Sequence, residues 1–227
     1  LYRADAFELR AEEMTVDWSP LALLRATLRI TAWHSPQVFI TLAPGNAATP
    51  APPEWRLPWR VELAGIRIAQ LAIHRGDAHL VTFERTELDA SLHADKIDLQ
   101  RLALRTNHAA LGLSGTYTAR APFPLDVRSV LEWQARADMP VAARGRLHGD
   151  LQRLAFEQAF SAPFTGSLRG EVHDPLTQRR WSAALDVGTL DLARLRPGWP
   201  AWTLRGALQG HGDRAAFAAE GSLSAEH

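Results

Sequence analysis

Alternation of apolar and polar residues runs along most of this chain and constrains its fold more than any other feature. Successive side chains of a β-strand point to opposite faces of the sheet, so strict alternation marks a strand with one buried face. Leu88, Ala90 and Leu92 alternate with polar neighbours, and Leu111 and Leu113 repeat the pattern. The runs are short and closely spaced, which predicts an all-β protein with many antiparallel strands.

Several runs contain a phase slip, where two residues instead of one separate consecutive apolar positions. It occurs in residues 66–73 and 97–104, with weaker copies in 149–156 and 190–195. One extra residue would invert the facing of all later side chains unless a β-bulge or a tight corner restores it. We therefore expect strands that bend repeatedly, in an elongated, curled antiparallel sheet that encloses a groove like a folded taco.

Glycine alternates with large apolar residues in the runs 145–151, 166–172 and 202–210. Glycine weakens the interior of a strand, so its presence there needs a local reason. On an inward face it makes room for curvature or for the close approach of another body.

Helix is expected at one or two short segments only. Pro20–Arg29 can form an amphipathic helix with Ser19 as its N-cap and Pro20 at the first helical position. Residues 191–196 can form one further turn, which Pro197 would end.

The domain organisation follows from these elements. We expect an N-terminal segment, 1–43, with the short amphipathic helix and the first strands. A Pro- and Ala-rich loop, 44–58, then acts as a hinge, and a repeated β-groove segment, 59–227, continues into a longer protein.

Composition excludes several classes of function. Lys and Arg together number 25, as do Asp and Glu, so the formal net charge is zero. A nucleic-acid binder needs a basic surplus, and we expect no nucleic-acid partner. The chain has no Cys and its 9 His are scattered, so we expect no metal and no cofactor. No apolar run approaches the roughly 20 residues of a membrane span.

Catalytic motifs are also missing. The string Gly112–Gly115 lacks the spacing of a nucleophile elbow. Gly210–Ala215 fits the loose dinucleotide fingerprint, but that fingerprint has meaning only between a strand and a helix. A hairpin turn in which Asp213 bonds its own backbone is expected instead. We therefore expect no enzyme activity and no catalytic residues.

Several stretches resemble the TamB and AsmA-like family. They are the W-x-P-L-x-L-L string of Trp18–Leu24, the Leu57–Val61 string, the Gly145–Leu154 string and the Gly206–Asp213 string. The similarity spans nearly the whole chain and is one of pattern, without a catalytic signature.

The resemblance implies a periplasmic protein tethered to the inner membrane by an N-terminal anchor that lies outside this sequence. It implies a β-groove, related to bridge-like lipid transfer proteins, that takes part in phospholipid transport and outer-membrane biogenesis. It also implies a TamA-like outer-membrane barrel as partner, in the translocation and assembly module used in protein secretion. The present chain would be an N-proximal or middle segment.

The residues support the same interpretation, because a curled sheet with an apolar inner face forms a trough for phospholipid acyl chains. An acyl chain laid in it gains roughly 0.8 kcal/mol per buried CH₂. The expected groove-lining residues are Leu63, Ile66, Ile68, Leu71, Ile73, Leu88, Leu92, Ile97, Leu99, Leu102, Leu104, Leu111, Leu113, Leu147, Leu168 and Leu208.

Two other functions remain open. An exposed sheet edge could accept strands of client outer-membrane proteins by β-augmentation, as a chaperone-like assembly scaffold does. An ordinary β-sandwich binding domain would instead close its apolar face into a dry core. The phase slips and the inward glycines count against the sandwich.

Overall fold

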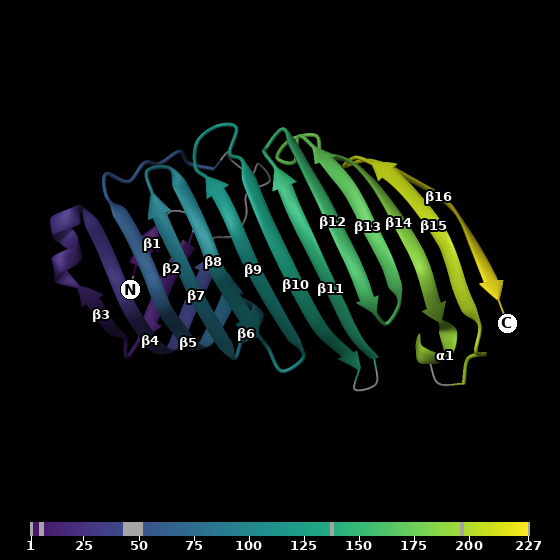
Figure 1. Ribbon diagram of the computed structural model, residues 1–227, viewed down its shortest axis with the longest axis horizontal. Coiled ribbons are helices and arrows are strands. Elements are labelled where there is room, and N and C mark those ends of the chain that lie inside the picture. Colours follow the sequence, from purple (N-terminus) through teal and green to yellow (C-terminus); the bar gives the residue numbers. More distant parts are fainter. Residues whose placement is uncertain (1, 5–6, 43–51, 137–138, 196–197, 227) are drawn as a thin grey trace. The chain divides into compact units, whose positions relative to one another are not determined.

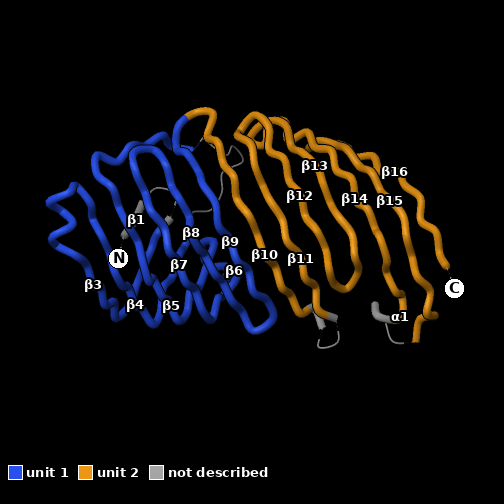
Figure 2. Tube along the Cα trace, in the orientation of Figure 1, with its two compact units in different colours: residues 1–120 blue, residues 121–227 orange. Residues whose placement is uncertain are grey.

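The computed structural model describes residues 2–4, 7–42, 52–136, 139–195 and 198–226. The chain divides into two compact units, unit 1 at residues 1–120 and unit 2 at residues 121–227 (Figure 2). Nearly all regular structure in both is β-strand, and the strands form open, curved sheets (Figure 1). The predicted all-β class and the curled sheet are therefore confirmed.

Unit 1 contains β1–β9 and one short 3₁₀ helix, η1. The strands pair in the order β1-β2-β4-β5-β7-β8-β9, while β3 pairs with β4 and β6 pairs with β5. Their bounds are β1 Tyr2–Ala4, β2 Phe7–Glu12, β3 Thr15–Ser19, η1 Pro20–Arg25, β4 Thr27–Leu42, β5 Arg60–Arg75, β6 Ala78–Phe83, β7 Arg85–His93, β8 Lys96–Arg105 and β9 Ala109–Thr118.

One pairing differs from the expected antiparallel pattern, because β4 and β5 run parallel in a constant register from Thr27↔Arg60 to Leu42↔Arg75. Parallel neighbours need a long crossover connection, and the Pro- and Ala-rich segment provides it. Residues 43–51 of that segment lie outside the described residues. Residues 52–59 of the segment pass the ends of the strands, where the Leu57 N–H donates a hydrogen bond to the Ala94 carbonyl. The ladder holds β4 and β5 side by side along their whole length, which does not fit a hinge in the segment that connects them.

In unit 1, β4 and β5 change their pairing partners at the same position along their shared ladder, and this position marks a corner in the sheet. The first half of β4 pairs with β3 and its second half with β2, and the change falls around Ser35. At the same level β5 pairs with β7 up to Ile68 and with β6 from Leu71 onward. This is the position of the phase slip in residues 66–73, so the predicted corner is confirmed.

The corner gives unit 1 a small core of its own. Val38, Ile66 and Leu71 are only 2%, 3% and 7% exposed, and Thr86 is also buried. The Ser35 hydroxyl donates a 2.8 Å hydrogen bond to the Glu12 carbonyl, which keeps this buried polar group satisfied. At the corner, therefore, the apolar face is filled by the protein's own side chains.

The helix expected at Pro20–Arg29 is shorter than predicted and is a 3₁₀ helix, Pro20–Arg25. Pro20 begins it as expected, but Ser19 makes no side-chain capping bond. Ala26 adopts a left-handed conformation, φ 49°, and ends the helix. The following residues pair with β5 from Thr27 onward, and this ladder outweighs the helical propensity of Leu28 and Arg29.

Unit 2 is an antiparallel meander in which every strand pairs with its neighbours in sequence. One helical turn, α1, follows β14, as predicted for residues 191–196. The bounds are β10 Leu125–Arg136, β11 Met139–Gly149, β12 Arg153–Ala162, β13 Thr165–His173, β14 Arg180–Asp191, α1 Leu192–Leu195, β15 Thr203–Gly212 and β16 Phe217–Glu226.

The other phase slips have different structural causes. Residues 97–104 contain the predicted bulge, since the registers of β8 shift between Leu99 and Leu102. The slip in 149–156 is the turn between β11 and β12, and not a bulge. The slip in 190–195 marks the end of β14 and the start of α1. A turn or a strand end gives the same residue pattern as a bulge, so the pattern alone does not distinguish them.

Candidate functional site

Cross-strand pairing defines the two faces of unit 2, because residues opposite each other share one face of a sheet. One row runs from β10 to β15 through Val127, Leu147, Phe156, Gly170, Ala183 and Gly210. Neighbouring rows on this face contain Leu125, Leu131, Leu154, Phe160, Leu168, Val172, Trp181, Leu185, Val187 and Leu208, with Ser129 and Gln158 as polar members. We call this surface the unit 2 apolar face.

Much of this face is open to solvent. Ala143 and Val187 are buried, but Leu147 and Leu208 remain 37% and 38% exposed. Toward β16 the exposure rises further, to 78% at Phe217. Figure 1 shows the strands of unit 2 as a single layer. A soluble sheet normally buries its apolar face against a second layer, so this surface can accept an apolar guest.

The glycines on this face are covered by large side chains from adjacent strands. A Cβ added at Gly170 would lie 2.6 Å from Cζ of Phe156, and one added at Gly221 would lie 2.5 Å from Cδ2 of Leu208. The space predicted at these glycines is therefore occupied by the protein itself. The absence of a Cβ at these glycines allows the large side chains of neighbouring strands to lie along the sheet, which leaves a flatter apolar surface.

The opposite face of unit 2 is charged. Arg146 donates a bidentate pair of hydrogen bonds to Asp126, at 2.8 and 2.6 Å. This guanidinium lowers the pKa of the Asp126 carboxyl. Glu171 contacts His173 and Arg153, and hydrogen bonds from these two side chains lower its pKa. These exposed ion pairs keep the outer face hydrated and contribute little to stability.

In unit 1 the registers place most of the expected groove residues on one face. A row across the sheet joins Trp33, Ile66, Leu88, Leu102 and Leu113. The adjacent rows contain Leu63, Leu99, Ile68, Leu104, Leu111, Leu92 and Ile97. Leu71 and Ile73 lie beyond the corner, where β5 pairs with β6. Register shifts between Leu63 and Ile66 in β5 and between Leu99 and Leu102 in β8 keep the apolar residues of these strands on this face.

The two units differ in how open these faces are. In unit 1, Ile66 and Leu71 belong to the buried corner, whereas the other expected residues are half-buried. Leu147, Leu168 and Leu208 lie on the unit 2 apolar face. Contact of any of these residues with lipid stays a prediction.

Other residues of the unit 2 apolar face were not in the predicted set. Phe156, Phe160, Trp181 and Leu185 contribute large side chains to it. The alternation around Trp181 marks a strand in the sequence, and the same period-two signal would have identified its inward residues. The pairing of these residues with glycines on the next strand has no signal in the local sequence.

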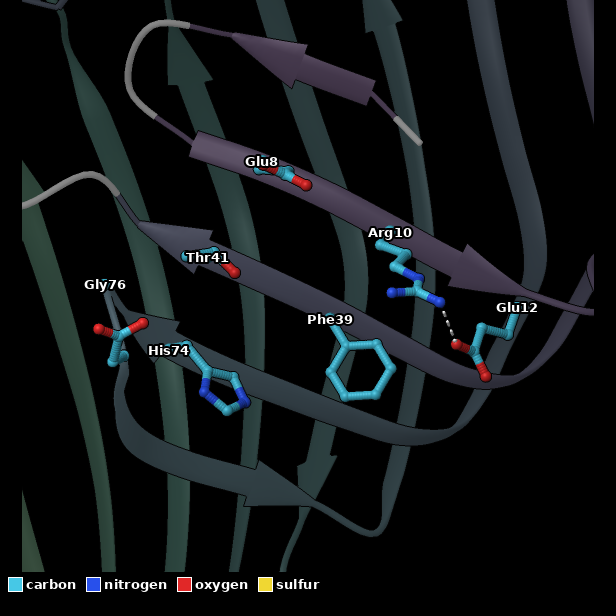
Figure 3. A pocket seen from close by; sticks show the side chains of 8 residues that line it. Glu8, Arg10, Glu12, Phe39, Thr41, His74 and Gly76 are labelled. Carbon is cyan, nitrogen blue, oxygen red and sulfur yellow. Dashed lines mark ion pairs between the residues drawn. The ribbon is translucent and has the colours of Figure 1, made fainter.

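A separate pocket of about 430 Å³ lies in unit 1, on the face of β2, β4 and β5 opposite to Ile73. Its lining is Glu8, Arg10, Glu12, Phe39, Thr41, His74, Gly76 and Asp77 (Figure 3). Arg10 and Glu12 form an ion pair of 3.2 Å, and the rings of Phe39 and His74 lie 6.3 Å apart. This charged lining does not suit an acyl chain.

The dinucleotide-like string forms a hairpin turn, as expected. Asp213 accepts hydrogen bonds from the N–H groups of Ala215 and Ala216, at 2.7 and 3.1 Å, between β15 and β16. These bonds lower the pKa of the Asp213 carboxyl. Within the described residues, no group of three or more His, Asp or Glu side chains is arranged to hold a metal ion. None of the helices in the described ranges is long and apolar enough to cross a membrane.

Comparison with known families gives a match that covers most of the chain. Residues 41–224 match the family described as "TamB, N-terminal domain". The match begins after the Trp18–Leu24 string, so the resemblance noted there stays untested. No curated protein and no solved structure matched the chain. The family match over these residues, together with the open all-β sheets, shows that the chain belongs to the TamB family.

Proposed function

We propose that the apolar faces of the two units bind phospholipid acyl chains, as a segment of a lipid-conducting bridge between the inner and outer membranes. The observation that carries this proposal is the unit 2 apolar face, where a single layer of strands exposes Leu147 and Leu208 to solvent. An acyl chain lying on such a face gains roughly 0.8 kcal/mol for each CH₂ group removed from water.

The chemistry of this face supports transport without catalysis. Its members are aliphatic, aromatic or glycine residues apart from Ser129 and Gln158. A surface without fixed charges does not select a head group, and many weak apolar contacts leave a lipid free to slide. The protein is therefore proposed to be non-enzymatic, with broad tolerance of phospholipid type.

Membership of the TamB family supports the cellular setting of the proposal. We infer a periplasmic location, with attachment to the inner membrane through a segment outside this sequence. A TamA-type outer-membrane barrel is the inferred protein partner, and outer-membrane assembly the inferred process. In this setting the apolar faces shield acyl chains from the aqueous periplasm.

The proposal is tested by measuring phospholipid that co-purifies with the chain, by mass spectrometry after washing. Leu147→Arg combined with Leu208→Arg places two cations on the unit 2 apolar face. A cation among acyl chains costs about 3 kcal/mol, so lipid bound across these positions should fall more than about tenfold.

Ala207→Arg is the matched control, because Ala207 is the neighbour of Leu208 on β15 and belongs to the opposite, hydrated face. This variant should keep the wild-type amount of lipid. Equal lipid in the double variant, the control and the wild type would show that the apolar face does not bind acyl chains.

A second candidate function is capture of client strands by β-augmentation. Within the described residues β16 pairs only with β15, and each of its residues is exposed. An unpaired strand edge is a template for another strand. Binding of outer-membrane barrel peptides that is lost on placing prolines in β16, with lipid content unchanged, would favour this function over the first.

A further inference from the structure

An exposed apolar surface lies at the β3 edge of unit 1, outside the expected groove residues. It consists of Met14, Val16, Trp18, Leu21, Leu23 and Leu24, and we call it the β3–η1 surface. Leu21, Leu23 and Leu24 are 75%, 51% and 85% exposed, and no residue of η1 is buried. Trp18 is 47% exposed. Such a concentration of exposed leucines marks an interaction site.

The distribution of the leucines around η1 indicates what covers them. A 3₁₀ helix has about three residues per turn, so Leu21 and Leu24 share one side and Leu23 lies about a third of a turn away. The apolar surface therefore extends around most of the helix. η1 lies against β4, so its outer sides are the accessible ones, and lipid chains can cover the leucines on both of them together.

Charge also favours a membrane surface. Between Asp17 and Glu54 the sequence contains no carboxylate, although it contains Arg25 and Arg29. Arg29 pairs with Glu62 at 2.6 Å, while Arg25 forms no ion pair within the described residues. Val16 and Trp18 pair with Trp33 and Ile30 of β4, whereas Asp17 pairs with Ala32, so Asp17 lies on the opposite face of β3 from Trp18. Exposed leucines and an indole suit the interface of a bilayer, and Arg25 beside the leucines adds a small attraction to anionic head groups.

We propose that the β3–η1 surface inserts into the interface of a bilayer that contains anionic phospholipids. The six residues of η1 are too few to span the roughly 30 Å hydrocarbon layer, so the contact is superficial and reversible. The leucines and Trp18 enter the boundary between head groups and acyl chains, and Arg25 stays among the phosphates. This inference rests on exposure and charge in unit 1 and does not depend on acyl-chain binding by unit 2.

The test is flotation of the 227-residue chain with vesicles of phosphatidylcholine, with or without phosphatidylglycerol. The wild-type chain should float with the vesicles that contain phosphatidylglycerol. Leu21→Ser combined with Leu24→Ser should lower the bound fraction about tenfold, because the inserted apolar area is lost. Arg25→Ser should weaken binding only to the anionic vesicles.

Leu80→Ser is the matched control, since Leu80 on β6 is 47% exposed and lies outside the β3–η1 surface. It should bind as the wild type does, and the Leu147→Arg/Leu208→Arg variant should also float normally. Circular dichroism establishes that each variant is folded. Absence of wild-type flotation, or equal flotation of the Leu21→Ser/Leu24→Ser variant, would overturn the proposal. A change in oligomeric state in place of vesicle binding would instead assign the surface to self-association.

Discussion

At the residue scale, glycines and large side chains are complementary across neighbouring strands of unit 2. Phe156 lies over Gly170, Leu208 lies over Gly221, and Cδ2 of Leu223 would lie 2.8 Å from a Cβ at Gly206. Each large side chain fills the space above the glycine backbone that a Cβ would otherwise occupy. These contacts bury apolar area within a single layer, which lacks a second sheet to pack against.

Gly170→Val should destabilise unit 2. The added Cβ would meet Cζ of Phe156 and the carbonyl oxygen of Ser182, and the backbone atom cannot move away cheaply. Overpacking of this kind costs about 1–3 kcal/mol in the free energy of unfolding, measured by urea denaturation. Ala184→Val is the control at an exposed residue of the opposite face of β14, and it should change stability little. A stability of Gly170→Val equal to that of the control would contradict this packing.

At the element scale, bulges keep the apolar residues of unit 1 on one face. Leu63 pairs with Ala90 and Ile66 pairs with Leu88, so two residues of β5 oppose Asp89 alone. Gly65 occupies the bulge with φ 65°, in the left-handed region that glycine tolerates. Its N–H donates a 2.8 Å hydrogen bond to Oδ1 of Asp89, which replaces the bond lost from the ladder.

Asp89→Ala should weaken this bulge, because the Gly65 N–H would lose its acceptor. The expected loss is about 1–2 kcal/mol in the free energy of unfolding. Asp89→Asn retains a side-chain carbonyl oxygen and should recover most of that loss. Asp98→Ala, at an exposed position of β8, tests for a general effect of removing a carboxylate. If Asp89→Asn were as unstable as Asp89→Ala, the charge of Asp89 rather than its hydrogen bond would be responsible.

At the scale of the whole molecule, the chain combines exposed apolar surfaces with a formal net charge of zero. Unit 1 encloses a small core at its corner, whereas unit 2 leaves most of its apolar face half-exposed. Electrostatic repulsion between copies is weak when the net charge is near zero, so apolar contact between copies is poorly opposed.

Self-association of the chain should therefore persist when salt is added, because apolar contact between copies does not depend on unscreened charges. Light scattering at matched protein concentration, at low and at high NaCl, measures the association. A marked fall in association at high NaCl would show that ion pairs, and not apolar contact, hold the copies together.

Features that depend on local pattern could be predicted from the sequence. Alternation identified the strands and the inward facing of residues such as Leu102 and Leu113, and the slip at 97–104 predicted a bulge. The turn at Asp213 also followed from residue type. These features depend on chain geometry over a few residues, because side-chain facing has a period of two wherever a strand forms.

The strand partners and the covering of the apolar surfaces became clear only from the folded chain. The parallel ladder of β4 and β5 joins residues that are 33 positions apart, and nothing in either strand specifies that partner. Distant segments also determine how the other apolar surfaces are covered. They bury Val38 at the corner, leave the β3–η1 surface exposed and place Phe156 over Gly170. Contacts between residues far apart in sequence set strand pairing and burial. Local periodicity shows which face of a strand is apolar, but not which strand pairs with it or what covers that face.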